Sequence, residues 1–195
     1  MNNPIPVLFS EEEIRARVHE LGEEISREYF DKNPLFVGVL KGCFIFMGDL
    51  VRCVTIPCEM DFMVVSSYSG TKSTGIVKII KDLSEDITDR DVIICEDIID
   101  SGLTLSYLKR LFHARGAASV KIATLLEKDI KHAVKPDYYG FKFQNAFVVG
   151  YGLDFNESFR NLPYVGIFNP ETQEVPDGPV SSSWTNEDRH ILPDK

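Results

Sequence analysis

Three carboxylate side chains fall within five residues at the end of one apolar run. Glu96 and Asp97 follow the run directly, and Asp100 comes after two isoleucines. Carboxylates at the end of a buried strand repel one another and lose hydration, so they need a cation, a donor-rich ligand or backbone amides. The structural alternative is that Asp100 or Ser101 only caps the next helix. The grouping favours a binding or catalytic site.

The residues after Asp100 have the composition of a phosphate-binding loop. Ser101 and Thr104 carry hydroxyls, Gly102 lets the backbone come close to a ligand, and Leu103 opens a predicted helix. The first amides of a helix have no partner within the helix and bind anions readily. This segment therefore predicts a site for a phosphate group.

Glu96 and Asp97 lie just upstream and supply acceptors for two vicinal hydroxyls, as on a ribose. Adjacent side chains of a strand point to opposite faces, so both acids reach one ribose only if the strand ends at Glu96. A ribose beside a phosphate-binding loop indicates a ribose 5-phosphate as ligand.

Size and charge exclude several other classes of function. The chain has 195 residues and a formal charge of −9, which disfavours nucleic-acid or anionic-membrane partners. It has no GxxxxGK[ST] loop, GxSxG elbow or HExxH pair, and the glycines at 150 and 152 lack the third of a dinucleotide fingerprint. There is no signal peptide and no run of about 18 apolar residues, so we expect a cytoplasmic protein.

The elements that position these residues alternate between helix and strand. Ser10 and Glu13 form a capping box before a helix expected at about 11–30, and further helices are predicted at 44–53 and 103–115. Apolar runs predict strands at 35–40, 60–66, 76–80, 92–95, 120–125, 147–149 and 164–168. This order predicts an α/β fold with a mainly parallel sheet, whose ligands bind at the carboxyl ends of the strands.

A few side chains have structural interpretations instead. The cysteines show no CxxC spacing and are interpreted as reduced core residues, with a zinc site or disulfide as the alternative: Cys43, Cys53, Cys58 and Cys95. His19 is interpreted as a surface residue. Residues 171–195, rich in proline and serine, are expected to form an extended or partly disordered tail in which Trp184 anchors locally.

Several motifs together resemble one family. VIICEDIIDSGLT, from Val92 to Thr104, resembles the phosphoribosyl pyrophosphate signature of the type I phosphoribosyltransferases. Within that group, the chain resembles the hypoxanthine-guanine phosphoribosyltransferases over about residues 7–170, in matching order and approximate spacing. The motifs that carry this narrower resemblance are Leu40-Lys41-Gly42, Ser67-Tyr68, Lys135-Pro136-Asp137 and FVVGYGLDFNESFRNLPY from Phe147 to Tyr164.

The resemblance implies a purine-salvage transferase that converts hypoxanthine or guanine plus phosphoribosyl pyrophosphate to IMP or GMP plus pyrophosphate, with Mg2+. It implies one phosphoribosyltransferase domain over 1–170, made of a five-stranded core sheet and a small hood from the amino-terminal segment and the residues after about 130. A homodimer or homotetramer is expected. Two alternatives remain open: a preference for xanthine or another nucleobase, and a non-catalytic regulator with the same fold.

The resemblance also assigns roles to residues. Asp100 matches the general base, and Ser101, Gly102, Leu103 and Thr104 match the 5-phosphate loop, although many members carry a lysine at the position of Leu103. The remaining assignments are as follows: Glu96 and Asp97 to the ribose hydroxyls; Glu96, Asp97 and Asp154 to Mg2+; Lys41, Gly42 and Arg160 to pyrophosphate; Lys135, Phe147, Val148 and Asp154 to the purine; Ser67 and Tyr68 to a mobile lid. A cis peptide between Leu40 and Lys41 is implied as well.

Overall fold

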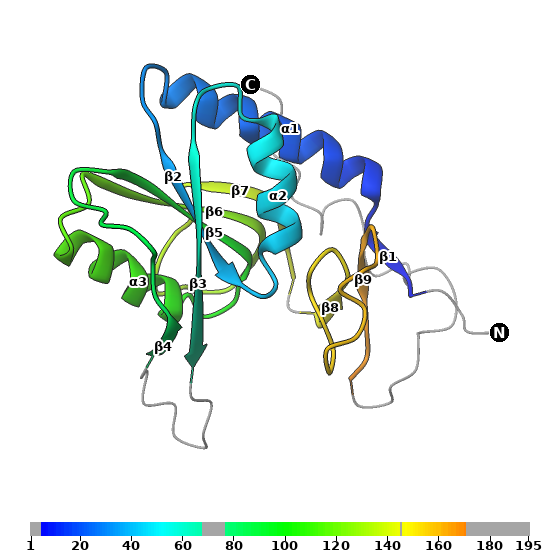
Figure 1. The fold of residues 1–195 in the computed structure, drawn as a ribbon. Coiled ribbons are helices and arrows are strands. Elements are labelled where there is room, and N and C mark those ends of the chain that lie inside the picture. Colours follow the sequence, from blue (N-terminus) through cyan, green and yellow to red (C-terminus); the bar gives the residue numbers. More distant parts are fainter. Residues whose placement is uncertain (1–4, 68–76, 145, 171–195) are drawn as a thin grey trace.

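The computed structural model describes residues 5–67, 77–144 and 146–170 (Figure 1). A six-stranded sheet with the strand order β4-β3-β2-β5-β6-β7 lies beside a three-stranded sheet with the order β1-β9-β8. The elements are β1 (Val7–Phe9), α1 (Glu11–Glu28), β2 (Leu35–Leu40), α2 (Phe44–Cys53), β3 (Glu59–Ser67), β4 (Val77–Lys81), β5 (Asp91–Ile99), α3 (Leu103–Ala114), β6 (Ser119–Lys128), β7 (Tyr138–Phe143), β8 (Val148–Val149) and β9 (Val165–Ile167).

The large sheet confirms the predicted α/β class and corrects its details. Five neighbouring strands are parallel, but β4 adds a sixth strand that is antiparallel to β3. Strand β7 was not predicted from the sequence, and it belongs to this sheet rather than to the hood. The second part of the hood, predicted to start after about residue 130, therefore starts only at about residue 146, after β7.

The helices begin where their sequence signals indicate. The Ser10 hydroxyl accepts the Glu13 amide at 3.2 Å, and the Glu13 carboxylate accepts the Ser10 amide at 2.8 Å, which confirms the capping box. Helix α1 ends at Glu28, two residues before the predicted end. Helix α2 has the predicted bounds, and α3 ends one residue early, ahead of Gly116, whose φ is 83°.

The core has two apolar layers, one on each face of the large sheet (Figure 1). Ile93 and Cys95 of β5 pack in the layer that contains the buried side chains of α1 and α2. Val92 and Ile94 pack in the other layer, with Leu108 and the other buried side chains of α3. Because helices cover both faces, only the edges and ends of this sheet are open to a ligand.

The small sheet forms the hood. Val7 of β1 pairs antiparallel with Gly166 of β9, and β8 pairs with the other side of β9. Beneath it, Ile5, Val149 and Phe168 are buried and pack against aromatic side chains of the 155–164 segment. The hood thus joins the amino-terminal strand to residues after 146.

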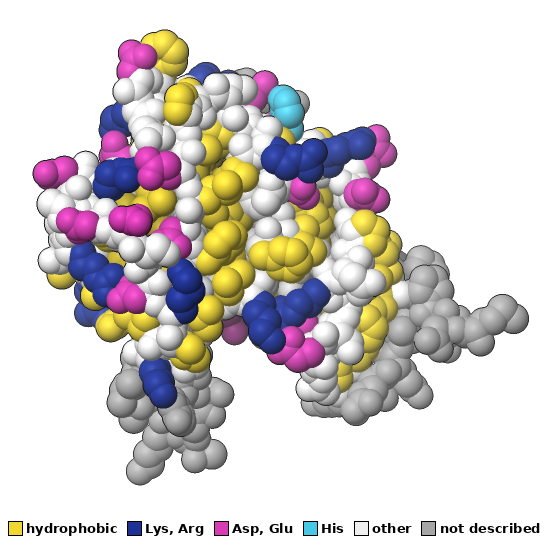
Figure 2. All heavy atoms as spheres, viewed as in Figure 1, with side chains coloured by type: hydrophobic (Ala, Val, Ile, Leu, Met, Phe, Trp, Pro, Cys, Tyr) yellow, Lys and Arg dark blue, Asp and Glu magenta, His cyan; other side chains and the backbone are white. Residues whose placement is uncertain are grey.

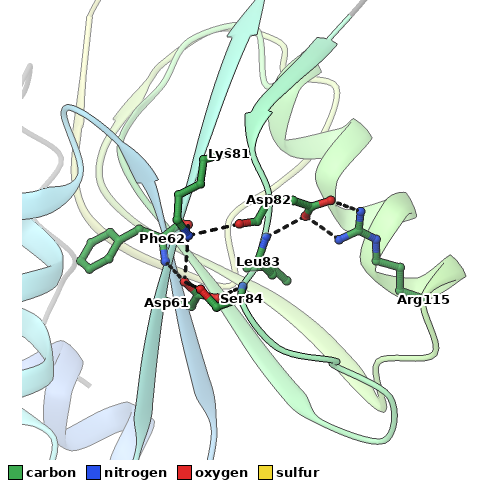
Figure 3. Close-up of polar contacts among 7 residues, drawn as sticks. All are labelled: Asp61, Phe62, Lys81, Asp82, Leu83, Ser84 and Arg115. Carbon is green, nitrogen blue, oxygen red and sulfur yellow. Dashed lines mark hydrogen bonds and ion pairs between the residues drawn. The ribbon is translucent and has the colours of Figure 1, made fainter.

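A polar network fixes the antiparallel edge of the large sheet (Figure 3). Asp61 of β3 accepts the Ser84 amide at 2.6 Å and the Phe62 amide at 2.7 Å, and its carboxylate lies 3.2 Å from the Lys81 ammonium. Arg115, at the end of α3, donates both guanidinium nitrogens to Asp82 at 2.7 and 2.6 Å. These contacts tie the turn after β4 to both β3 and α3.

The Asp61 carboxylate is expected to stabilise the fold in a pH-dependent way. Burial raises its pKa, but the Ser84 and Phe62 amides and the Lys81 ammonium lower it by more, so the net pKa lies below the ordinary value. A lowered pKa gives stability that is present above the unfolded pKa, about 3.9, and lost as the pH falls through the folded pKa. Asp61→Asn should cost about 1–2 kcal/mol at pH 7 in urea unfolding.

The difference between Asp61→Asn and the parent should shrink as the pH drops below about 4, where the parent carboxylate also becomes protonated. Glu85→Gln, an exposed change in the same turn, is the matched control and should leave the unfolding free energy unchanged. An equal cost of Asp61→Asn at pH 7 and at pH 3 would refute the electrostatic explanation.

His19 and two of the four cysteines have the surroundings predicted for them, whereas Cys53 and Cys58 are only partly buried. All four cysteines are free thiols, and Cys43 and Cys95 are buried. His19 is exposed and lies 3.8 Å from Glu23 on the same helix. Trp184 and the predicted tail fall outside the described residues. Among the helices of the described part of the chain, none is long and apolar enough to cross a membrane.

Candidate functional site

The predicted site residues lie mainly on segments that leave the carboxyl ends of β2, β5 and β6. The turn at 41–42 follows β2, the loop at 100–104 follows β5, and the connection at 129–137 follows β6. Neighbouring parallel strands end at the same edge of a sheet, so these segments share one edge. A hood segment, residues 150–160, meets them there.

The turn after β2 contacts the end of β5 very closely. The peptide bond between Leu40 and Lys41 is cis, as the resemblance implies. A β-carbon built on Gly42 would lie 1.6 Å from the Asp97 Oδ2 atom, so the carboxylate occupies the space that any other residue would fill. Only glycine at 42 lets Asp97 lie directly against this turn.

The hood segment packs on the same turn. Gly152 has a φ of 101°, and a β-carbon there would lie 2.2 Å from the Gly42 carbonyl oxygen. The Lys41 ammonium lies 3.1 Å from the Glu157 carboxylate of the hood. The predicted pyrophosphate-binding turn is therefore held between the core sheet and the hood.

Asp154 and Arg160, which the sequence places in one loop, form an ion pair. An Arg160 guanidinium nitrogen lies 2.8 Å from Asp154 Oδ1, and another donates to the Gly152 carbonyl at 2.7 Å. The buried Arg160 Nε atom has no hydrogen-bond partner among the described residues. Arg160 thus links Asp154 to the glycine that touches the turn after β2, while one of its donors remains unused.

Glu96 and Asp97 could both reach one ribose only if strand β5 ended at Glu96, and the structure does not meet this condition. Strand β5 continues to Ile99, and Glu96 and Ile98 keep their pairing with β6 in unbroken register. The strand therefore does not end at Glu96, because pairing with β6 keeps the backbone extended past both acids. Asp97 lies against Gly42, and the Glu96 Oε2 atom is buried without a hydrogen-bond partner among the described residues.

Burial dominates the electrostatics of these two acids. It raises the pKa of Asp97 to about 6, although backbone amides and Arg160 oppose the shift. Burial, followed by the repulsion from Asp97, raises the pKa of Glu96 well above its usual value. Burial also raises the pKa of the neighbouring Cys43 and Cys95 thiols, with a contribution from Glu96. Ionised acids here are costly unless a cation joins them.

The loop after β5 has an uncapped helix start. The N-cap of α3 is Gly102, with a φ of 71°, and no side chain caps the helix. The Leu103 amide has only a long contact, 3.4 Å, to the Ser101 hydroxyl. This geometry contradicts the structural alternative that Asp100 or Ser101 serves as the helix cap. The first amides of α3 are available to an anion, as a phosphate-binding loop requires.

Contacts from the connection after β6 hold the 100–104 loop. The Ala133 amide donates to the Ser101 carbonyl at 2.9 Å, and a β-carbon on Gly102 would meet Val134 at 3.2 Å. Lys135 follows directly and is exposed. The predicted purine donor is thus connected through its own segment to the predicted phosphate loop.

Asp100 has a partner that sequence reasoning missed. The Lys128 ammonium lies 3.1 Å from Asp100 Oδ1. From the sequence, ligands were expected at the carboxyl ends of the strands, but Lys128 was not singled out. The available signal was a lysine just after an apolar run, the place where parallel strands present ligand-binding residues.

The hood carries the predicted aromatic. Phe147 is 41% exposed, with its ring 5.8 Å from Phe155 in an edge-to-face arrangement and 6.3 Å from Phe168. Val148 is buried and pairs with Ile167. An exposed ring is free to stack on a flat base.

The predicted lid residues and one cavity remain to be placed relative to this site. Ser67 is the last residue of β3 and pairs with Val77, and Tyr68 lies outside the described residues. A cavity of about 590 Å³ between α1, α2 and the 151–163 segment is lined by none of the predicted site residues. The site is therefore the strand-end edge rather than this cavity.

The acids at this edge fit a magnesium ion that is bound together with a substrate. No group of three or more histidine, cysteine or acidic side chains gathers as a metal site within the described ranges. Mg2+ usually takes one or two carboxylates and completes its shell with water and substrate phosphates. The buried, unpartnered Glu96 oxygen and the adjacent Asp97 supply such carboxylates, with Asp154 in electrostatic reach of Asp97.

Comparison with known proteins gives consistent matches. A family model described as the phosphoribosyl transferase domain matches residues 8–156. The chain is 56% identical to hypoxanthine-guanine phosphoribosyltransferase of Bacillus subtilis (strain 168), over 86% of this chain and 95% of that protein. It is 53% identical to the protein of the same name from Lactococcus lactis, over 85% and 91%. A crystal structure of a hypoxanthine phosphoribosyltransferase from Staphylococcus aureus matches with a TM-score of 0.82 and 44% identity, over 85% and 92%.

Proposed function

The chain belongs to the phosphoribosyl transferase family, and we propose that it joins hypoxanthine or guanine to phosphoribosyl pyrophosphate, giving IMP or GMP and pyrophosphate. One observation supports this most. The uncapped start of α3 lies on the same sheet edge as the Lys41–Gly42 turn and Asp97. Such an edge offers separate sites for the 5-phosphate and for the pyrophosphate of one sugar.

The sugar phosphate is bound by backbone amides more than by side-chain charge. The amides at the start of α3 and the hydroxyls of Ser101 and Thr104 receive the 5-phosphate. One of the two acids, Glu96 or Asp97, accepts hydrogen bonds from the ribose hydroxyls, because β5 continues past Glu96 and turns adjacent side chains to opposite faces. Because these acids are buried and close together, their charge is balanced best when the cation and the sugar are both present.

The departing pyrophosphate gathers negative charge as the anomeric carbon–oxygen bond breaks. Arg160 and the backbone of the Lys41–Gly42 turn bind this group, and Arg160 has an unused donor at Nε. Mg2+ held by one or two of the carboxylates of Glu96, Asp97 and Asp154 would supply charge neutralisation for the polyphosphate. The hood thus contributes directly to the leaving-group site through Arg160.

The purine must lose a proton while it attacks the sugar. Asp100 accepts the proton from the imidazole side of the base, and the electron pair of that nitrogen–hydrogen bond stays in the ring. The ring nitrogen forms the bond to the anomeric carbon, and pyrophosphate leaves with the electrons of the broken bond. Lys135 donates to the 6-oxo group, Val148 and Asp154 contact the base, and Phe147 stacks on its face.

Pyrophosphate release with four bases tests this function. With Mg2+ and phosphoribosyl pyrophosphate, hypoxanthine and guanine should react, whereas adenine should not, because its amino group presents hydrogens where Lys135 requires an acceptor. Chelation of Mg2+ with EDTA should stop release, and added Mg2+ should restore it. A dominant reaction with xanthine would change the proposed substrate, and release with none of the four bases would refute the transferase.

A non-catalytic regulator with the same fold is the second candidate. Regulators that bind nucleic acid need a basic surface, but the chain carries a net charge of −9. Figure 2 shows acidic and basic side chains intermixed on the visible face, without a continuous basic stripe. Asp100, Lys135 and Arg160 are all present, and a regulator would not need a proton acceptor in its phosphate loop. These observations favour the enzyme.

The assignments of assembly and location complete the proposal. We assign residues 1–170 to one functional domain, with Ser67 and Tyr68 in a segment that closes over the reacting groups. Four free thiols agree with a reducing cytoplasm. Two exposed apolar side chains, Phe44 just after the turn that follows β2 and Met60 near the start of β3, suit contact with a second copy in a homodimer or homotetramer.

A further inference from the structure

We propose that Lys128 is a positioning residue that holds the Asp100 carboxylate in place as the proton acceptor. The inference rests on the proposed function, since it concerns the same reaction. Lys128 Nζ lies 3.1 Å from Asp100 Oδ1; the lysine side chain is 16% exposed and the aspartate side chain 65%. A largely buried ammonium thus extends from the sheet to an exposed carboxylate on a loop.

The sheet register places the two residues side by side. Ile99, the last residue of β5, pairs with Glu127 of β6, so Asp100 and Lys128 are the next residues along the two neighbouring strands. Lys128 also pairs with Phe143 of β7, which fixes its backbone from the other side. Because strand pairing on both sides holds the lysine backbone, Lys128 can define the position of the loop residue Asp100.

A histidine ring joins the backbones of the same two residues. His132 Nε2 lies 2.6 Å from the Lys128 carbonyl oxygen, and Nδ1 contacts the Asp100 carbonyl oxygen. The His132 side chain is only 5% exposed. Around this group, Glu127 lies 3.8 Å from His132 and 3.4 Å from Lys142. The ion pair between Lys128 and Asp100 is therefore built on a clamped backbone.

The pair leaves one carboxylate oxygen for the substrate. The closest contact of Lys128 is with Oδ1, and the Asp100 side chain is 65% exposed, which leaves the carboxylate open to a substrate at Oδ2. An ammonium beside Oδ1 restrains rotation of the carboxylate and offsets its charge in a loop that must also receive a phosphate. Oδ2 is then the oxygen that takes the proton.

A double-mutant cycle of Asp100→Asn and Lys128→Met tests the inference. Lys128→Met should lower kcat about 10-fold and leave KM for phosphoribosyl pyrophosphate within about twofold, because the lysine acts through the proton acceptor. Lys128→Arg should recover most of the lost turnover. In the Asp100→Asn background, Lys128→Met should change kcat by less than about twofold, since there is no carboxylate left to position.

Lys121→Met is the matched control. Lys121 lies on the same strand, β6, and pairs with Glu28 near the opposite end of the sheet. Its replacement should affect the unfolding midpoint and not kcat. If Lys128→Met does not fold, Lys128→Gln takes its place in the cycle.

The outcomes separate this inference from the proposed function. No pyrophosphate release by the unmodified protein would refute the function itself. If the parent protein is active and Lys128→Met keeps full turnover, the inference about Lys128 is overturned and the proposed function stands. The inference would also be overturned if the loss of kcat in the double variant equalled the product of the losses in the two single variants. Such a result would show that Lys128 does not act through Asp100.

Discussion

Asp100→Asn is expected to reduce kcat about 100-fold or more, while KM for phosphoribosyl pyrophosphate changes little. The amide retains the size of the side chain but cannot accept a proton at neutral pH, and general base catalysis commonly contributes 100-fold or more. The 5-phosphate is bound by the amides at the start of α3, which the substitution leaves in place. Steady-state rates of pyrophosphate release measure both constants.

Asp129→Asn provides the control for Asp100→Asn. Asp129 is an exposed acid just after Lys128, on the segment that packs near the same loop. Its substitution should leave kcat unchanged. If Asp100→Asn retained the turnover of the parent, the assignment of Asp100 as general base would be wrong, and the ion pair with Lys128 would be structural only.

Gly42→Ala is expected to reduce kcat/KM for phosphoribosyl pyrophosphate about 100-fold. The new β-carbon would lie 1.6 Å from the Asp97 Oδ2 atom, so either the acid or the turn must move. Gly152 packs on the Gly42 carbonyl, and a shift of the turn therefore also displaces the hood segment that carries Arg160. Small displacements of binding groups are enough to cause losses of this size.

Gly48→Ala is the matched control for Gly42→Ala, with the same chemical change only six positions further on. Gly48 lies within α2, and a β-carbon there meets nothing within 4 Å. This variant should keep full activity and gain about 0.5–1 kcal/mol of stability, because alanine favours helix over glycine. Normal kinetics for Gly42→Ala would contradict the close contact between the turn and Asp97.

Local signals in the sequence predicted the helices and the main strands well. The Ser10 and Glu13 pair defines the start of α1 because both hydrogen bonds form within one turn. The apolar runs predicted β2 and β5 because their side chains are buried on both faces. Strand β7 was missed: Gly140 interrupts its apolar pattern, and its place beside β6 is a long-range contact.

The candidate site was predicted in part from residue types and largely from the family resemblance. The acids and the phosphate loop could be found from their composition. The continuation of β5 past Glu96 could not, because it depends on pairing with β6. The contact of Gly42 with Asp97 and the pairing of Lys128 with Asp100 also join segments that are distant in the sequence. Spacing along the chain carries no signal for such contacts.

The pairing of β1 with β9 has a consequence for biosynthesis. Val7 is translated well before its partner Gly166, so β1 stays unpaired while the parallel sheet is being made. The turn at Gly42 likewise waits for Gly152. A nascent chain can therefore assemble its central layers before it has a working leaving-group site. Substrate turnover should begin only once the last hood strand has been synthesised and added to the sheet.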